Sequence, residues 1–139
     1  MLKDVAEKYY FSQNYNCAET IIRAANEYYS LGITDRDMIM VAGFGAGMQT
    51  ADTCGCLLSA ISVLSLKYVE QRAHESADIQ SVVFLLTKKF RERYGSTLCR
   101  EIKPKFFRKE YRCRDTVFLA CDILEETLAE YQPKGTKEA

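Results

Sequence analysis

Apolar residues recur with a helical period along most of this chain. Between residues 17 and 29 they fall at i, i+3, i+4 and i+7, which places them on one helix face: Ala18, Ile21, Ile22, Ala25, Tyr28 and Tyr29. The stretch 57–69 is apolar on most sides, as expected of a central, buried helix. The pattern predicts an all-α, single-domain bundle of about five or six helices over residues 1–132, with a polar C-terminal tail at 133–139.

Polar residues indicate where these helices begin. Asn16 and Glu19 have the spacing of a capping box, in which each side chain accepts a hydrogen bond from a backbone N–H at the helix start. Thr34 is expected to cap the next helix, and Asp52 or Thr53 the central one. The expected helical segments are about 2–12, 17–31, 34–42, 53–69, 78–94, a short turn at 96–104, and a last helix from about 113.

Composition and charge narrow the classes of function. The chain has 139 residues, is 47% hydrophobic and carries a net charge of zero, so its total charge favours neither nucleic acid nor a membrane surface. Residues 1–8 mix acids and bases where a signal peptide needs an apolar run. No segment has the roughly 20 apolar residues needed to cross a bilayer. We therefore expect a cytoplasmic protein with no membrane insertion.

A cytoplasmic location changes the interpretation of the six cysteines, because a reducing compartment favours core thiols, metal ligands or reactive thiols over disulfides. Cys17, Cys54, Cys99 and Cys113 each follow a capping signal or lie in or next to a predicted first helical turn. A helix N-terminus offers free N–H donors and partial positive charge, which favour the thiolate. These four are the predicted site residues, with inert packing as the alternative for each.

The other two cysteines lack this position. Cys121 lies in the middle of the last helix among apolar residues and is expected in the core. Cys56 follows Cys54 by two residues, on a different side of the same helix. Packing is the expected role of Cys56, and a strained Cys54–Cys56 disulfide is the alternative.

Basic residues are concentrated in the segment 88–114, where eleven Lys and Arg against three Glu give a net charge of +8. Arginine follows Cys99 directly and flanks Cys113 on both sides, so we expect these cations to lower the thiol pKa further. A solvated basic face is the alternative. We expect no nucleic-acid binding, because the aromatic residues at positions 106, 107 and 111 have helical spacing and are expected to point inward.

Common site motifs are missing from the sequence. There is no C-x-x-C pair, and the gaps between the four cysteines match no standard zinc or iron–sulfur spacing. The glycine-rich break from Gly43 to Gly47 lacks the Lys and Ser or Thr of a phosphate loop. His74, the sole histidine, lies in a polar turn and is expected at the surface.

Several segments together are nevertheless similar to a known family. They are Asn16–Glu19, Ala42–Met48, Thr53–Gly55, Gly95–Glu101 and Cys113. In this order they resemble the C_GCAxxG_C_C family, whose members have four characteristic cysteines and are inferred to be redox-active. Two alignments of the central motif are open, one taking Cys54 as the family's cysteine and the other taking Cys56, with Leu57 in place of Ala.

Three functions follow as hypotheses. The leading one is thiol–disulfide exchange with an unidentified redox partner protein and no required cofactor, in which one low-pKa cysteine attacks and a second resolves the mixed disulfide. The expected pairs are Cys17 with Cys54, from their shared capping signals, and Cys99 with Cys113, from their short separation and basic surroundings.

The second hypothesis is a metal or iron–sulfur module with the four thiolates as ligands. The third is a non-enzymatic helical interaction protein, for instance a homodimer, whose tyrosine-rich first helices supply an interface. Whether the protein is an enzyme stays open at this point.

Overall fold

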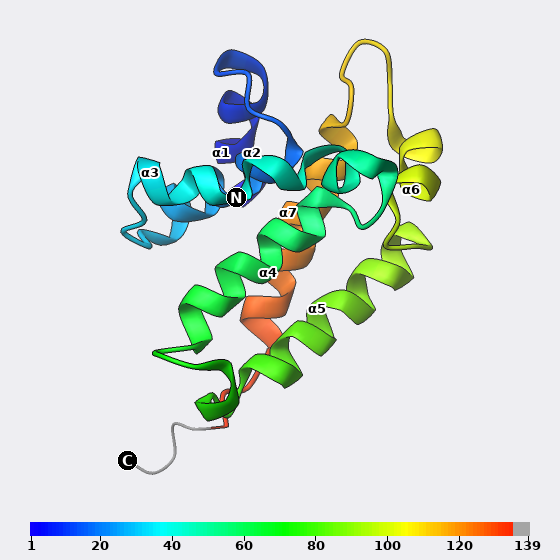
Figure 1. Ribbon diagram of the computed structural model, residues 1–139. Helices are drawn as coiled ribbons and strands as arrows, with labels where there is room; N and C mark the ends of the chain where they lie inside the picture. The colour runs from blue at the N-terminus through cyan, green and yellow to red at the C-terminus, as the bar shows by residue number, and fades with distance from the viewer. Residues whose placement is uncertain (135–139) are drawn as a thin grey trace.

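In the computed structural model, which describes residues 1–134, the chain consists of α-helices joined by short 3₁₀ and π turns (Figure 1). The α-helices are α1 (Leu2–Glu7), α2 (Cys17–Tyr29), α3 (Asp35–Met38), α4 (Gly55–Tyr68), α5 (Ile79–Tyr94), α6 (Cys99–Phe106) and α7 (Arg114–Glu130). The turns are η1 (Lys8–Ser12), η2 (Ile39–Phe44), η3 (Gly47–Ala51) and η4 (Ala73–Glu75). The predicted all-α class is confirmed for the described residues.

The described part of the chain has seven α-helices, whereas the sequence pattern predicted about five or six. The difference comes from α6, which the pattern predicted only as a short turn at 96–104. A helix this short is marginal by itself, and α6 is stabilised by packing on α7 and η3.

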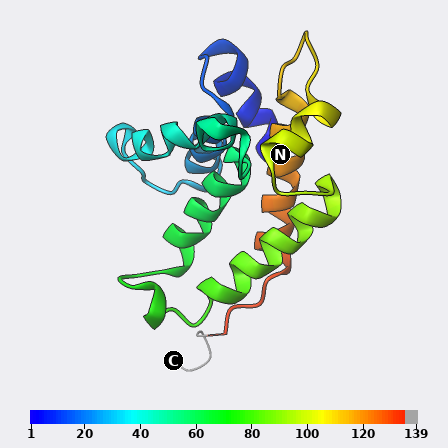
Figure 2. The same ribbon diagram turned by 45° about the vertical axis from the view of Figure 1, so that its right-hand side comes forward.

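The long helices α4, α5 and α7 run side by side, with α5 antiparallel to α4 (Figures 1 and 2). Helix α2 packs on α4, and α1 packs on α7 and α2. The core between them includes the fully buried residues Leu64, Leu86 and Leu124. This arrangement brings the starts of α4 and α7 to the end of the bundle at which α5 finishes and α6 begins.

Two predicted caps are confirmed. Asn16 and Glu19 form the capping box of α2: Asn16 Oδ1 accepts from Glu19 N at 2.9 Å, and Glu19 Oε1 accepts from Asn16 N at 3.0 Å. Thr34 Oγ1 accepts from Asp37 N at the start of α3. Helix α2 ends before Gly32, because Ser30 already adopts the left-handed conformation and serves as its C-cap.

The predicted N-cap of the central helix is wrong. Cys54, rather than Asp52 or Thr53, is the N-cap of α4. Thr53 instead forms an isolated antiparallel bridge with Leu98, and this pairing keeps the backbone extended up to Cys54.

Two predicted helices change type part of the way along. The segment expected to be helical over 2–12 is α-helical to Glu7 and then continues as the π turn η1. The segment expected over 34–42 becomes the 3₁₀ turn η2 from Ile39. Of the residues in η2 only Val41 is buried, so little packing holds this stretch to an α-helical repeat.

The predicted glycine-rich break at 43–47 is partly ordered into η2 and η3. Non-glycine residues after Gly45 have left-handed backbone, at Ala46, Met48, Gln49 and Ala51. Such conformations cost about 1–2 kcal/mol each for L-residues, and they cluster at sites where the surrounding structure enforces them.

No helix within residues 1–134 is both long and apolar enough to cross a membrane. Of the predicted tail 133–139, residues 135–139 lie outside the described residues. Lys134 belongs to the described part, and its backbone N–H donates to Asp78 at the start of α5.

Replacement of Leu86 by Ala tests the core. Leu86 is fully buried on α5, so we expect Leu86→Ala to lower the free energy of unfolding by about 2–5 kcal/mol through lost burial and a residual cavity. Phe84→Ala on the same helix is the control, because Phe84 is 70% exposed and its loss should change stability by less than about 0.5 kcal/mol. Urea denaturation measures both, and equal losses would contradict this packing.

Candidate functional site

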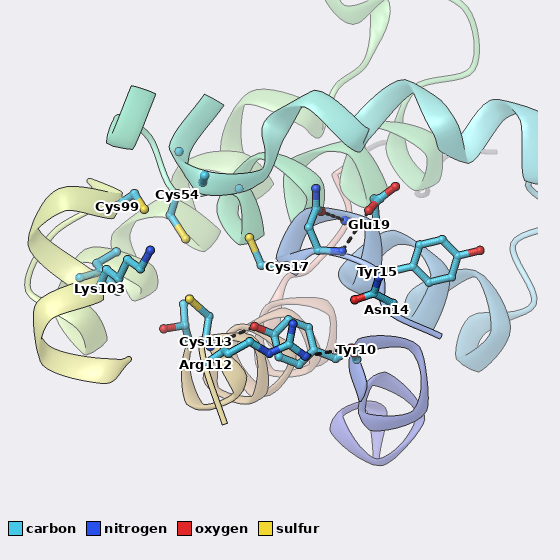
Figure 3. A pocket seen from close by; sticks show the side chains of 16 residues that line it. Tyr10, Asn14, Tyr15, Cys17, Glu19, Cys54, Cys99, Lys103, Arg112 and Cys113 are labelled. Carbon is cyan, nitrogen blue, oxygen red and sulfur yellow. Dashed lines mark hydrogen bonds between the residues drawn. The ribbon is translucent and has the colours of Figure 1, made fainter. Parts of the chain in front are cut away.

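The four predicted cysteines line one cavity of about 300 Å³ (Figure 3). They come from four different helices: Cys17 is the first residue of α2, Cys54 is the N-cap of α4, Cys99 is the first residue of α6, and Cys113 is the N-cap of α7. Their sulfur atoms point into the same space. The predicted position of these cysteines at helix starts is confirmed.

Two backbone hydrogen bonds hold the start of α4 against the start of α6. The N–H of Cys54 donates to Thr97 O at 2.8 Å, and the N–H of Cys99 donates to Asp52 O at 2.7 Å. Two cysteines that are far apart in sequence are therefore held at neighbouring helix starts by main-chain hydrogen bonds.

Two glycines let the chain segments that line the cavity pack closely against each other. A Cβ on Gly55 would lie 2.5 Å from Phe44 O and 3.2 Å from Cys17 Sγ. A Cβ on Gly47, whose φ is +60°, would lie 2.6 Å from Cys99 Cβ. No larger residue fits at either position without displacing the cavity wall, so these glycines are part of the site.

Tyr10 positions the fourth cysteine, a role for which no sequence pattern offers a specific signal. Its hydroxyl oxygen accepts a hydrogen bond from the N–H of Cys113 at 3.0 Å, so η1 is tied to the start of α7. The Arg112 guanidinium lies over the Tyr10 ring, 4.6 Å from its centroid. Burial raises the pKa of the Tyr10 hydroxyl to about 12, which keeps it protonated.

The pKa of Cys113 is not lowered as predicted. Burial raises it to about 11, and the negative charge of Cys17 adds to this. The flanking arginines face other partners: Arg112 lies over Tyr10, and Arg114 lies over the Tyr111 ring at 3.8 Å.

The prediction for Cys99 is wrong for a similar reason. Burial raises the pKa of Cys99, followed by repulsion from Cys54 and Cys17. Arg100, its neighbour in sequence, forms an ion pair with Asp52 at 3.8 Å instead. The cation that does act on the thiol is Lys103, whose ammonium group points into the cavity and lowers the pKa of Cys99 and of Cys113.

The pKa values of Cys17 and Cys54 are lowered, the direction predicted for helix starts, but the largest cause is the Cys56 side chain. A hydrogen bond from the Cys56 side chain lowers the pKa of Cys17 to about 7 against opposing burial, and backbone N–H groups, that of Ala46 first among them, lower it further. The same Cys56 hydrogen bond is the largest cause of the lowered pKa of Cys54. The sequence assigned Cys56 to packing and missed this contact.

All six cysteines are free thiols in this structure. Cys121 is fully buried in the core as predicted, and burial raises its pKa. Within the described residues 1–134, no three His, Cys, Asp or Glu side chains are grouped so that they could hold a metal ion. The metal or iron–sulfur hypothesis stays a prediction.

Residues 107–112, which belong to the basic segment, are exposed in the connection between α6 and α7. Helix α6 ends at Phe106, so Phe107 and Tyr111 lie in the connection to α7 and are exposed rather than pointing inward as predicted. The helical spacing expected for them is interrupted there, where Arg108 and Arg112 form a backbone bridge.

Gly55→Ala tests the close approach of α4 to α2. Because the added methyl group meets a backbone oxygen and the Cys17 sulfur, we expect a loss of about 1–3 kcal/mol in unfolding free energy and a changed alkylation rate at Cys17. Gly43→Ala is the control, since a Cβ there meets nothing within 4 Å. Equal behaviour of the two variants would contradict the described packing.

Lys103→Gln tests the charge inside the cavity. Removal of this cation should raise the pKa of Cys99 and Cys113, and so shift their alkylation profiles to higher pH. Lys105→Gln, an exposed position of α6 outside the cavity lining, should leave both profiles unchanged. Peptide mapping of alkylated protein between pH 6 and 10 distinguishes the two, and identical profiles would show that Lys103 does not act on these thiols.

The chain also shows similarity at the family level. Residues 15–127 match the family described as "Putative redox-active protein (C_GCAxxG_C_C)". No curated protein and no solved structure shows significant similarity to the chain. The matched range covers most of the chain and contains all four cavity cysteines, and this protein therefore belongs to the C_GCAxxG_C_C family.

Proposed function

We propose that the protein carries out thiol–disulfide exchange in this cavity, with Cys17 as the attacking thiolate and Cys54 as the resolving cysteine. The observation that carries this proposal is that both thiols line one cavity and that the Cys17 sulfur lies against the start of α4, where a Cβ on Gly55, the residue after Cys54, would be 3.2 Å from it. Two thiols held this close, in a cavity that is open to a substrate, are suited to forming a disulfide with each other.

Exposure and acidity support Cys17 as the attacking residue. Its pKa of about 7 gives a large thiolate fraction near neutral pH, and thiols with a pKa near the ambient pH are the most effective attackers. Cys17 is half-buried, whereas Cys54 is almost fully buried. A disulfide entering the cavity therefore meets Cys17 more readily.

The exchange proceeds in two steps. The Cys17 thiolate attacks one sulfur of a disulfide RSSR, forming a mixed disulfide and releasing RS⁻. Cys54 loses its proton to this first leaving thiolate and attacks the Cys17 sulfur, which releases the second RS⁻. The two protein thiols are oxidised to a Cys17–Cys54 disulfide, and RSSR is reduced to two thiols.

We assign Cys99 and Cys113 to a step after the attack by Cys17. Their raised pKa values keep them as thiols while Cys17 reacts, and they line the same cavity. Their pairing with each other stays a prediction. A protein of this kind would act in a reducing cytoplasm, with a disulfide-bearing partner as the oxidant.

Serine substitutions test the assigned roles with 4,4′-dithiodipyridine as RSSR. Cys17→Ser should abolish the fast release of thiopyridone, because the attacking thiolate is lost. Cys54→Ser should retain the first release but stop at a mixed disulfide on Cys17, which mass spectrometry detects. Cys121→Ser is the control and should retain both steps, since Cys121 lies in the core away from the cavity. A fast reaction at wild-type rate in Cys17→Ser would overturn the proposal.

A pH series checks the thiolate assignment. The rate at Cys17 should rise with pH and reach half its maximum near pH 7, because only the thiolate reacts. Cys113, whose pKa is about 11, should stay slow throughout the neutral range. Iodoacetamide labelling with peptide mapping follows both residues in one sample. A midpoint near pH 9 for Cys17 would remove the basis for its role.

A further inference from the structure

Two cations of the basic segment 88–114 line the cysteine cavity without an acidic partner. Elsewhere in this segment cations are neutralised by carboxylates, as Arg108 is by Asp115 at 2.9 Å. Lys103 and Arg112 both line the cavity, and within residues 1–134 neither of them forms an ion pair with an acid. Their charges are therefore available to a ligand.

The Arg112 side chain is held in place by its backbone and by two aromatic rings. Its φ is +53°, and its backbone forms the bridge with Arg108. The guanidinium lies 4.6 Å from the Tyr10 ring centroid and 5.7 Å from that of Phe11. Left-handed backbone at a non-glycine residue persists only where the surrounding structure enforces it, and such residues cluster at ligand sites.

Most of the hydrogen-bonding capacity of Arg112 is unused. Within residues 1–134, its guanidinium donates one hydrogen bond, from Nη2 to Tyr10 O at 3.5 Å. A guanidinium has five N–H donors, and stacking on a ring occupies its face rather than its edge. The edge can therefore bind a carboxylate through two parallel hydrogen bonds.

Lys103 supplies the second charge from a different element. It follows Cys99 by four residues on α6, so the two side chains lie on the same helix face. Its ammonium group points into the cavity (Figure 3) and lies 5.1 Å from the Phe107 ring centroid. The cavity thus receives one positive charge from α6 and another from the connection before α7.

The one carboxylate in the cavity lining does not offset these charges directly. Glu19 Oε1 accepts a hydrogen bond from the N–H of Asn16 in the capping box of α2. In the view of Figure 3, Glu19 lies on the other side of Cys17 from Lys103. The side of the cavity formed by α6 and the start of α7 is therefore the one suited to an anion.

The size of the cavity limits what that anion is part of. At about 300 Å³ it is at the lower end of the range for small-molecule sites. We propose that the substrate of the exchange is a low-molecular-weight disulfide bearing a carboxylate, which Lys103 and Arg112 bind while the Cys17 thiolate attacks one of its sulfurs. This inference rests on the proposed function, since it names the substrate class of the same reaction.

The carboxylates do not alter the balance of the exchange. Attack by Cys17 releases the first carboxylate-bearing thiolate and leaves the second half of the substrate in the mixed disulfide. Attack by Cys54 on the Cys17 sulfur releases that half. Two electrons pass from the protein thiols to the substrate, which leaves as two thiols.

The competing role for the two cations is to stabilise cavity thiolates without contacting a substrate. Iodoacetate and iodoacetamide separate the roles, because they alkylate the same thiolate with the same leaving group and differ in charge. The ratio of their rates at Cys17 cancels the thiolate fraction. A cation that acts only on thiol pKa therefore leaves this ratio unchanged.

Removal of either cation should lower the ratio of the iodoacetate rate to the iodoacetamide rate at Cys17. We expect a fall of about threefold in Lys103→Gln and in Arg112→Gln, and of about tenfold in the double variant, as for loss of exposed ion pairs. Arg112→Lys keeps the charge and should retain most of the ratio, and it serves as the test if Arg112→Gln does not fold. Added NaCl should lower the wild-type ratio through screening.

The matched control is the double variant Arg91→Gln/Lys105→Gln. It removes the same two residue types from exposed positions of the basic segment outside the cavity lining, so the net charge changes equally. Its ratio should stay within about twofold of the wild type, since distant exposed charges are screened.

Disulfide probes then test the substrate class. 3,3′-Dithiodipropionic acid carries two carboxylates and 2-hydroxyethyl disulfide carries none, and each rate is divided by that of the same probe with N-acetylcysteine. The wild type should favour the diacid, and the Lys103→Gln/Arg112→Gln variant should lose this preference. A disulfide-linked acidic peptide should react more slowly than the diacid, because the cavity is small.

Three results would overturn the inference: an unchanged iodoacetate ratio in the cavity double variant, an equal fall in its control, or a faster reaction with the acidic peptide. Each can occur while Cys17→Ser is inactive and the Cys17 midpoint stays near pH 7, in which case the proposed exchange stands. A wild-type rate in Cys17→Ser with dithiodipyridine would instead count against the exchange itself.

Discussion

The site depends on a pair of backbone hydrogen bonds that join the start of α4 to the start of α6. They connect Cys54 to Thr97 and Cys99 to Asp52. Main-chain bonds fix position and direction together, so the two helices present their first turns to the same space. Since free N–H groups at a helix start carry partial positive charge, this convergence would be unfavourable in an apolar cavity and is favourable in one that holds thiolates.

The cavity wall next to this junction has a backbone conformation that is rare for non-glycine residues. Four non-glycine residues between Gly45 and Asp52 have positive φ, and local hydrogen bonds hold them there, among them Asp52 N to Gly47 O at 2.9 Å and Gln49 Nε2 to Gly45 O at 2.9 Å. The same path directs the N–H of Ala46 toward Cys17, where it helps to lower the thiol pKa. The segment with the strained backbone is therefore also the segment that supplies the Ala46 N–H to the site.

The four cavity cysteines divide into two electrostatic classes even though all of them begin helices. Cys17 and Cys54 gain a hydrogen bond from Cys56 that outweighs their burial, whereas at Cys99 and Cys113 burial is the largest effect. Arginines next to a cysteine in sequence do not change this, because consecutive residues at a helix start point in different directions. Arg112 lines the cavity but lies over the Tyr10 ring, whereas Lys103, one turn into α6, points into the cavity and lowers the pKa of both thiols.

Local residue patterns were enough to predict the helical class, the capping box of α2 and the position of four cysteines at helix starts. These features depend on residues within a few positions of one another, and hydrophobic periodicity and capping residues indicate such local structure directly. Only the packed structure shows that the four helix starts meet at one cavity, that Thr53 pairs with Leu98, and that the Cys17 sulfur lies against Gly55 at the start of α4. Those contacts join residues from different helices, and their formation depends on how the long helices pack, which no local pattern encodes. Gly55 shows the difference: its place beside Cys54 belongs to the predicted helix start, but the Cys17 sulfur that leaves no room for a larger residue there comes from another helix.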